Sequence, residues 1–218
     1  MAGADRARHS NCPAAASRDP TPLGYNGAVT EMIRSAGLCV SESDWPLLSK
    51  YERLWSEPLA ENEDFLSITV WRSTSDPTRY IALNHYATPD AALRIEEEAT
   101  ESGLLVDLMG SWQEPPDLRF IRIEAREGLV PEQVEFKHLA SFSTRVADTG
   151  QGDELSRELT YIFEELMLMD GFLGCMKGRL EGVPEEIIGV AFWRTREAFQ
   201  KSLPSKARYK VDLFERVI

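Results

Sequence analysis

The stretch FLGCMKGRLEGVPEEIIGVAFWRTREAF, residues 172–199, decides the fold. Its two apolar segments, residues 172–180 and 186–194, are separated by Glu-Gly-Val-Pro, which is typical of a turn between strands. We therefore expect the two segments to pair as a hairpin. Thr195 then caps a short helix, which Pro204 ends.

The sequence on either side of this hairpin completes a unit of six elements. Residues 136–146 (FKHLASFSTRV) alternate as a strand. A helix follows, because apolar residues recur at helical spacing between Asp153, its expected cap, and Gly171, its expected stop. Residues 209–217 alternate as a closing strand. The predicted order is strand, helix, strand, strand, helix, strand.

The preceding part of the chain repeats this order, with an insertion at 103–117 that we interpret as a rim loop. Its expected elements are a strand at 29–40, a helix at 44–60, hairpin strands at 65–73 and 80–88, a helix that starts at 88–90, and a strand at 118–125. The sequence therefore predicts an α+β fold, with two tandem ferredoxin-like βαββαβ repeats forming a dimeric-α/β-barrel-type architecture. The repeats would span residues 25–128 and 134–218, after a flexible tail at 1–24.

Composition excludes several classes of function. The 218 residues carry 36 acidic and 24 basic side chains, a formal charge of −12, which disfavours binding to nucleic acid and to anionic membranes. The three cysteines, Cys12, Cys39 and Cys175, lie far apart and form no metal-binding or disulfide pattern. Without a long apolar run, the chain is expected to be cytoplasmic.

The second half resembles the antibiotic biosynthesis monooxygenase-like (ABM) family of the dimeric α/β-barrel superfamily. Gly171-Phe172-Leu173 and the run Val190-Ala191-Phe192-Trp193-Arg194-Thr195-Arg196-Glu197-Ala198-Phe199 carry the resemblance. In the first half the likeness is weaker, since Tyr86 stands where the Trp would be. The resemblance implies a barrel with an apolar pocket, and relatives that either oxygenate polycyclic phenols without a cofactor or degrade haem.

The resemblance also carries over Trp193 as a pocket residue. The sequence departs from the family pattern at two places. Cofactor-free relatives place an Asn four residues before the Trp, where this chain has Gly189, and Ala82 at the equivalent place before Tyr86. Haem-degrading relatives carry a ligand His in or after the final helix, whereas residues 202–210 contain none. Oxygenation is thus favoured over haem degradation.

Strand alternation assigns faces if helices cover the more apolar side of each strand. This places Ser67, Thr69 and Trp71 inside the barrel, and likewise Gly189 with Trp193. By the duplication, Asn84 and Tyr86 join them. The aromatic and sulfur side chains would stack on a planar ligand, although aromatics also simply fill barrels. These stacking residues are Trp71, Tyr86, Met176 and Trp193.

The same alternation places His85 and His138 under the helices, which favours buried structural histidines. Imidazole is nonetheless suited to proton abstraction near neutral pH, so either is a candidate base. Asn84 is the candidate that would stabilise developing negative charge.

The leading hypothesis is a cofactor-independent monooxygenase that oxidises a polycyclic aromatic, polyketide-type intermediate of secondary metabolism. Its partners would be a small aromatic substrate and molecular oxygen, with neither nucleic acid nor membrane, and the chain could still form a homodimer. One alternative is a non-catalytic ligand-binding or assembly barrel. The other is a haem-binding oxygenase, for which His85 and His138 are the candidate ligands.

Overall fold

The computed structural model describes residues 31–59, 61–103, 106, 112–203 and 211–218. The first half contains β1 (Met32–Cys39), α1 (Trp45–Leu59), β2 (Phe65–Ser73), β3 (Arg79–Tyr86), α2 (Pro89–Glu101) and β4 (Asp117–Gly128). After the 3₁₀ turn η1 (Pro131–Gln133), the second half contains β5 (Leu139–Val146), α4 (Gly152–Met167), β6 (Phe172–Leu180), β7 (Glu186–Trp193), α5 (Arg196–Ser202) and β8 (Val211–Arg216). The tail at 1–24, Pro204 and residues 104–105 and 107–111 of the insertion at 103–117 lie outside the described residues.

The eight strands close into one antiparallel barrel in the order β1-β3-β2-β8-β5-β7-β6-β4. Each half contributes four adjacent strands, and the halves join where β2 pairs with β8 and β4 with β6. The predicted α+β class and barrel are therefore confirmed. The expected hairpin strands at 172–180 and 65–73 have the bounds of β6 and β2.

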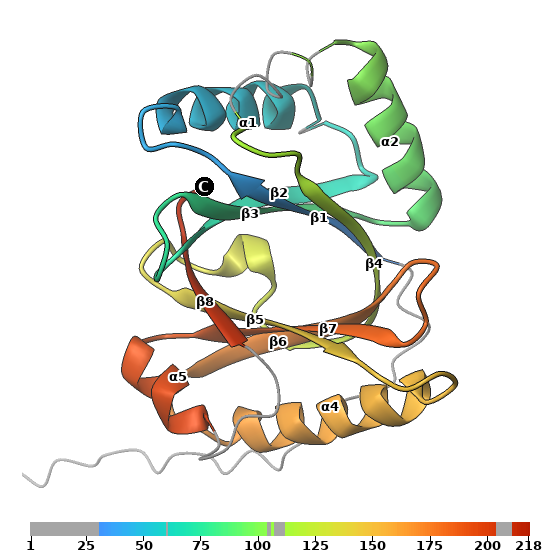
Figure 1. The fold of residues 1–218 in the computed structure, drawn as a ribbon, viewed down its shortest axis with the longest axis vertical. Helices are drawn as coiled ribbons and strands as arrows, with labels where there is room; N and C mark the ends of the chain where they lie inside the picture. The colour runs from blue at the N-terminus through green and yellow to red at the C-terminus, as the bar shows by residue number, and fades with distance from the viewer. Residues whose placement is uncertain (1–30, 60, 104–105, 107–111, 204–210) are drawn as a thin grey trace, which may run out of the picture.

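Helices cover the outside of the barrel on two opposite sides. Figure 1 shows α1 and α2 over the strands of the first half, and α4 and α5 over those of the second. Every strand thus has one face toward the lumen and one toward solvent or a helix. Within the described residues, no helix has the length and apolar character needed to cross a membrane.

One of the two expected helix caps is present, since the Thr195 side chain accepts a hydrogen bond from the backbone N–H of Ala198. The helix expected to start at 88–90 begins there, and the Thr88 side chain accepts from the backbone N–H of Ala91. The expected cap Asp153 is wrong, because Gln151 is the N-cap of α4. The carboxylate of Asp153 lies in the first turn and accepts from Arg179 Nη2 at 2.9 Å.

The connector between the halves closes one end of the lumen. Val134, next to η1, is fully buried and packs against the side chains that fill the barrel. Arg216 on β8 holds this segment, since its Nη1 donates to the backbone oxygens of Pro131, Glu132 and Val134. The turn η1 is visible between the two sheets in Figure 1.

Candidate functional site

A cavity of about 550 Å³ lies inside the barrel. Small-molecule sites commonly measure about 300–1,000 Å³ and are mostly apolar. The first half lines the cavity with aliphatic side chains, namely Ile33, Ile81, Leu83, Ile121 and Ile123. The second half lines it with Phe142, Met176, Ile188, Val190 and Phe214. The two halves therefore form two facing walls, one aliphatic and one partly aromatic.

The aromatic wall is held by ring contacts. The rings of Phe142 and Phe214 meet edge to face, with centroids 5.1 Å apart. Trp71 packs edge to face on Phe142 at 6.3 Å and stacks on Phe192 at 5.8 Å. Such contacts add to the stability from burial alone. The wall presents fixed aromatic surface to the cavity.

Charged side chains surround the rim of the cavity in ion pairs. Arg79 lies 3.4 Å from Asp76 and 3.9 Å from Glu114. Arg119 lies 2.8 Å from Asp117 and contacts Glu186 more closely. Of these pairs, those of Arg79 are exposed and contribute little to stability. They do make the rim polar, so it stays hydrated around an apolar interior.

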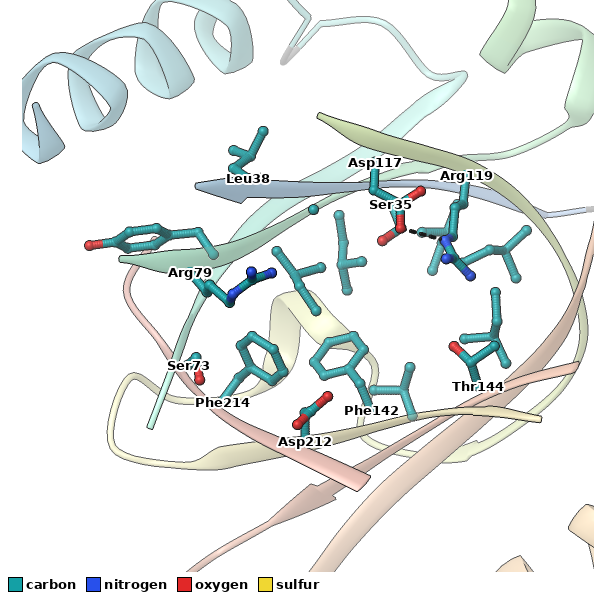
Figure 2. Close-up of a pocket in the computed structure, with 18 of the residues that line it drawn as sticks. Ser35, Leu38, Ser73, Arg79, Asp117, Arg119, Phe142, Thr144, Asp212 and Phe214 are labelled. Carbon is teal, nitrogen blue, oxygen red and sulfur yellow. Dashed lines mark hydrogen bonds and ion pairs between the residues drawn. The ribbon is translucent and has the colours of Figure 1, made fainter. Parts of the chain in front are cut away.

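Asp212 brings a carboxylate to the aromatic wall. It lies on β8 directly across from Phe142 on β5 and two residues before Phe214, so all three side chains share the lumen face. Figure 2 shows Asp212 beside these two rings, with Ser35 and Arg119 on the facing wall. The arrangement places an acid–base group beside the aromatic rings of the cavity.

A buried charged cluster occupies the closed end of the lumen. His85 is 2% exposed; its Nε2 lies 3.1 Å from Glu31 Oε2, and its Nδ1 lies 3.8 Å from Glu132 Oε2. Burial lowers the pKa of His85, but the two carboxylates outweigh burial and raise the pKa overall. The hydrogen bond with His85 lowers the pKa of Glu31. His85 therefore lies in the lumen between Glu31 and Glu132, and the expected position under a helix is wrong.

The other predicted lumen residues of the first half support this closed end. Ser67 Oγ donates to Glu132 at 3.2 Å, and Thr69 Oγ1 accepts from Trp71 Nε1 at 2.9 Å. Trp71 is fully buried behind Phe142. Their expected lumen orientation is confirmed, but of the predicted ligand-binding residues Met176 is the one that lines the cavity.

Asn84 and Tyr86 face α2, so the expected lumen orientation is wrong. Asn84 Nδ2 donates to Tyr86 Oη at 3.2 Å, and the Tyr86 hydroxyl donates to Glu96 on α2. Arg34 Nε completes the group at 2.6 Å from Glu96. Burial and the charge of Glu96 raise the pKa of Tyr86. The two side chains form a structural network between sheet and helix.

Trp193 also faces the helices, against the expected orientation. It packs edge to face on Phe172 and Phe199, and its Nε1 donates to Ser141 Oγ at 2.9 Å. Gly189 shares this face: a Cβ there would lie 3.0 Å from Leu159 Cδ2 on α4. Small residues on β7 therefore permit close helix packing and do not mark free space.

His138 precedes β5 and is 8% exposed. Its backbone N–H donates to Glu135, and its Nδ1 has no hydrogen-bond partner among the described residues. The residues that follow it on the same face, Ala140 and Phe142, pack in the lumen, so the expected face of β5 is reversed. Neither His138 nor His85 is among the described residues that line the cavity.

Asp212, Ser35 and Arg119 are among the polar lining residues that the sequence did not reveal. For Asp212, the sequence did contain one indication: Asp212, Phe214 and Arg216 alternate along the last strand and therefore share one face. Across the described chain, no three His, Cys, Asp or Glu side chains are placed to hold a metal ion.

Comparisons with known proteins bear on the fold. Neither a protein-family model nor a curated protein sequence matches the chain. Similar solved structures include a candidate monooxygenase from Fusobacterium nucleatum, with 9% identity, a TM-score of 0.69 and coverage of 86% of this chain and 93% of that one. A candidate monooxygenase from Lactobacillus acidophilus shows 10% identity, a TM-score of 0.67 and coverage of 86% and 94%. An anthrone oxidase-like protein shows 13% identity, a TM-score of 0.64 and coverage of 87% and 92%.

Proposed function

We propose that the lumen binds a planar, hydroxylated polycyclic aromatic molecule and oxidises it with molecular oxygen, without a cofactor. The observation that carries this proposal is the cavity of about 550 Å³, with an aliphatic wall facing an aromatic wall. A flat apolar ligand buries both of its faces in such a space, because each wall supplies broad apolar contact. The similarity of fold to candidate monooxygenases and to an anthrone oxidase-like protein supports the choice of reaction.

The reaction draws its electrons from the substrate. For an anthrone, the net change is that a CH₂ group and O₂ become a C=O group and water. Removal of a C–H proton leaves a delocalised anion, which an apolar, water-poor cavity protects while it reduces oxygen. A carbon–oxygen bond forms, and the resulting hydroperoxide loses water. The two hydrogens and one oxygen atom leave as water, and the other oxygen stays as the carbonyl.

We also propose a cellular role and an evolutionary origin for the chain. We place it among the ABM-like oxidoreductases of secondary metabolism, acting on a polyketide-type intermediate in the cytoplasm. Both halves contain the order strand, helix, strand, strand, helix, strand, with strand orders β4-β1-β3-β2 and β8-β5-β7-β6. This supports two tandem ferredoxin-like repeats, at 25–128 and 134–218, derived from one ancestral unit.

Oxygen uptake by metal-free protein tests the proposal. Protein treated with chelator is mixed with anthrones and naphthols, and oxygen consumption is compared with the spontaneous rate. Val190→Phe, which adds volume in the lumen, should reduce the excess uptake at subsaturating substrate by about tenfold or more. Tyr161→Ala, at a side chain 66% exposed on α4, should leave it unchanged. Uptake no faster than the spontaneous rate with every compound would refute the oxygenase function.

A non-catalytic binding barrel is the second candidate. The observation that favours it is the position of Trp193, which the family resemblance assigns to the pocket but which packs under α4 and α5. Such a barrel would bind the same flat aromatic molecules. Quenching of tryptophan fluorescence by these ligands, without oxygen uptake, would select this function.

The haem alternative does not fit the residues of the cavity. A haem there would need an axial ligand on the lining, and both candidate histidines, His85 and His138, lie outside the lining within the described chain. His85 is also engaged with Glu31 and Glu132. No step of the proposed reaction is therefore assigned to haem.

A further inference from the structure

We propose that Asp212 is the catalytic base of the lumen, an inference that rests on the proposed oxidation. Its carboxylate would take the acidic proton of an aromatic substrate that lies between the two walls. The substrate class is then an anthrone-like or phenolic aromatic with its acidic hydrogen directed toward the β5–β8 wall.

The position of Asp212 in the sheet is the first argument. On β8, residues 212, 214 and 216 share one face, and Phe214 packs inside the barrel. Asp212 is paired in register with Phe142 on β5, the second ring of the aromatic wall. A ligand in contact with these two rings therefore lies next to the carboxylate (Figure 2).

The other acidic side chains of the cavity lie at its rim. Asp76 and Glu114 flank Arg79, and Asp117 lies 2.8 Å from Arg119. Glu114 and Asp117 are exposed, whereas Asp76 and Asp212 are partly buried, and of these two Asp212 is the one beside the aromatic rings. Among the acidic residues that line the cavity in the described chain, Asp212 is the one on the aromatic wall.

The facing wall supplies donors for the charge that the reaction creates. Ser35 on β1 and Arg119 on β4 line the cavity opposite Asp212 (Figure 2). A hydroxyl and a guanidinium stabilise an oxyanion by hydrogen bonding and charge. In an anthrone the carbonyl lies across the ring from the acidic carbon. Such a substrate could place its acidic carbon next to Asp212 and its carbonyl oxygen next to Ser35 and Arg119.

The proton balance uses Asp212 twice. The carboxylate takes the first C–H proton, and the bonding pair passes into the ring system. Oxygen accepts these electrons and forms the carbon–oxygen bond, and the peroxide takes the proton back from Asp212. The carboxylate then removes the second C–H proton while the O–O bond breaks. The departing hydroxide takes that proton and leaves as water, so Asp212 returns to its initial state.

Anaerobic proton exchange tests the base separately from the oxidation. Without oxygen, the wild type in D₂O should exchange the methylene protons of anthrone faster than buffer alone. Asp212→Asn should slow the catalysed exchange and the aerobic oxygen uptake by about 100-fold or more, the usual contribution of a general base. Its affinity for anthraquinone, from tryptophan fluorescence, should stay within about threefold, because the apolar walls are unchanged. Asp64→Asn, the same change at the exposed Arg94 ion pair, should behave as the wild type.

The outcomes separate the two proposals. Full oxygen uptake by Asp212→Asn would overturn the role of Asp212 and leave the oxygenase function standing. Catalysed exchange that depends on Asp212, without oxygen uptake, would support the base and refute the oxygenase. If neither reaction exceeds the buffer rate in the wild type, both fail.

A second variant covers the case in which Asp212→Asn does not fold. Asp212→Glu moves the carboxylate by one methylene group, so exchange should fall about 10- to 100-fold at unchanged affinity. An unchanged rate would overturn the proposal.

Discussion

The two faces of β7 show how differently the lumen and the helix side of this barrel are built. On the lumen face, Ile188, Val190 and Phe192 are large, yet a cavity remains beside them. On the helix face, Gly189 and Ala191 are small, yet α4 leaves no room there. Small side chains on β7 thus lie where a helix packs closely, and large ones lie where the opposing element is distant. The lumen is wide because the four strands of each half face those of the other half across it.

The buried polar residues also differ between the helix side and the lumen side of the barrel. On the helix side, Lys177 Nζ donates to Ser156 and Thr160 on α4, and the Tyr86 hydroxyl donates to Glu96 on α2. These buried groups are satisfied by hydrogen bonds to a helix. In the lumen, Asp212 and Ser35 face the cavity. The difference assigns structure to one face and ligand contact to the other.

Removing Trp193 should have the largest effect on stability. Trp193→Ala deletes a fully buried ring that contacts Phe172 and Phe199, so the free energy of unfolding should fall by about 3–5 kcal/mol. Urea denaturation followed by circular dichroism measures this loss. The folded fraction should bind anthraquinone as the wild type does. A stable variant that has lost binding would instead put Trp193 in the ligand site.

Enlarging Gly189 should lower the free energy of unfolding by less than Trp193→Ala does. The loss should still be greater than the loss from enlarging the adjacent residue, Val190. In Gly189→Val the added carbons meet Leu159 and Phe163, which predicts a loss of about 1–3 kcal/mol. In Val190→Phe the added atoms enter the cavity, so stability should change by less than about 1 kcal/mol. The two variants are compared by urea denaturation. Equal losses would contradict the open lumen beside β7.

Val190→Phe should nevertheless weaken ligand binding, by about tenfold or more, because the phenyl ring occupies space that a flat ligand needs. Fluorescence titration with anthraquinone gives the dissociation constant. Leu168→Ser, at a side chain 76% exposed, is the control with unchanged binding. Wild-type affinity in Val190→Phe would move the binding site elsewhere.

The smallest expected effect concerns the closed end of the lumen. The pKa of His85 is raised above its ordinary value of 6.5 by Glu132 and Glu31, although burial opposes them. Its contribution to stability is therefore fully present below about pH 6.5 and is lost as the pH rises through the raised pKa. The stability advantage of the wild type over His85→Gln should therefore shrink as the pH rises above about 6.5 and through the raised pKa. An advantage that stays constant as the pH rises would contradict a raised pKa at His85.

The sequence predicted the elements well because local signals define them. The turn at 181–184 and the Thr88 and Thr195 caps depend on a few neighbouring residues, and each lies where expected. The orientation of β2 was also predictable, since Val70 packs with Leu48 while Trp71 faces the lumen.

The orientations of β3 and β7 could not be predicted in the same way. Both faces of these strands are buried, so alternation does not distinguish a helix from a second sheet. Asn84 binds Glu96, and His85 lies between Glu31 and Glu132. These partners are distant along the chain or lie on other elements, so the sequence alone does not reveal them. Asp212 emerged only once the closed barrel placed β8 beside β5.

A crystal structure of the protein with bound anthraquinone tests the central claim most directly. The account predicts ligand density in the lumen, with one face against Phe142 and Phe214, the other toward Ile33 and Ile121, and an edge toward Asp212. Density at Trp193 beneath α4 and α5, or on the outer surface with a ligand-free lumen, would contradict it.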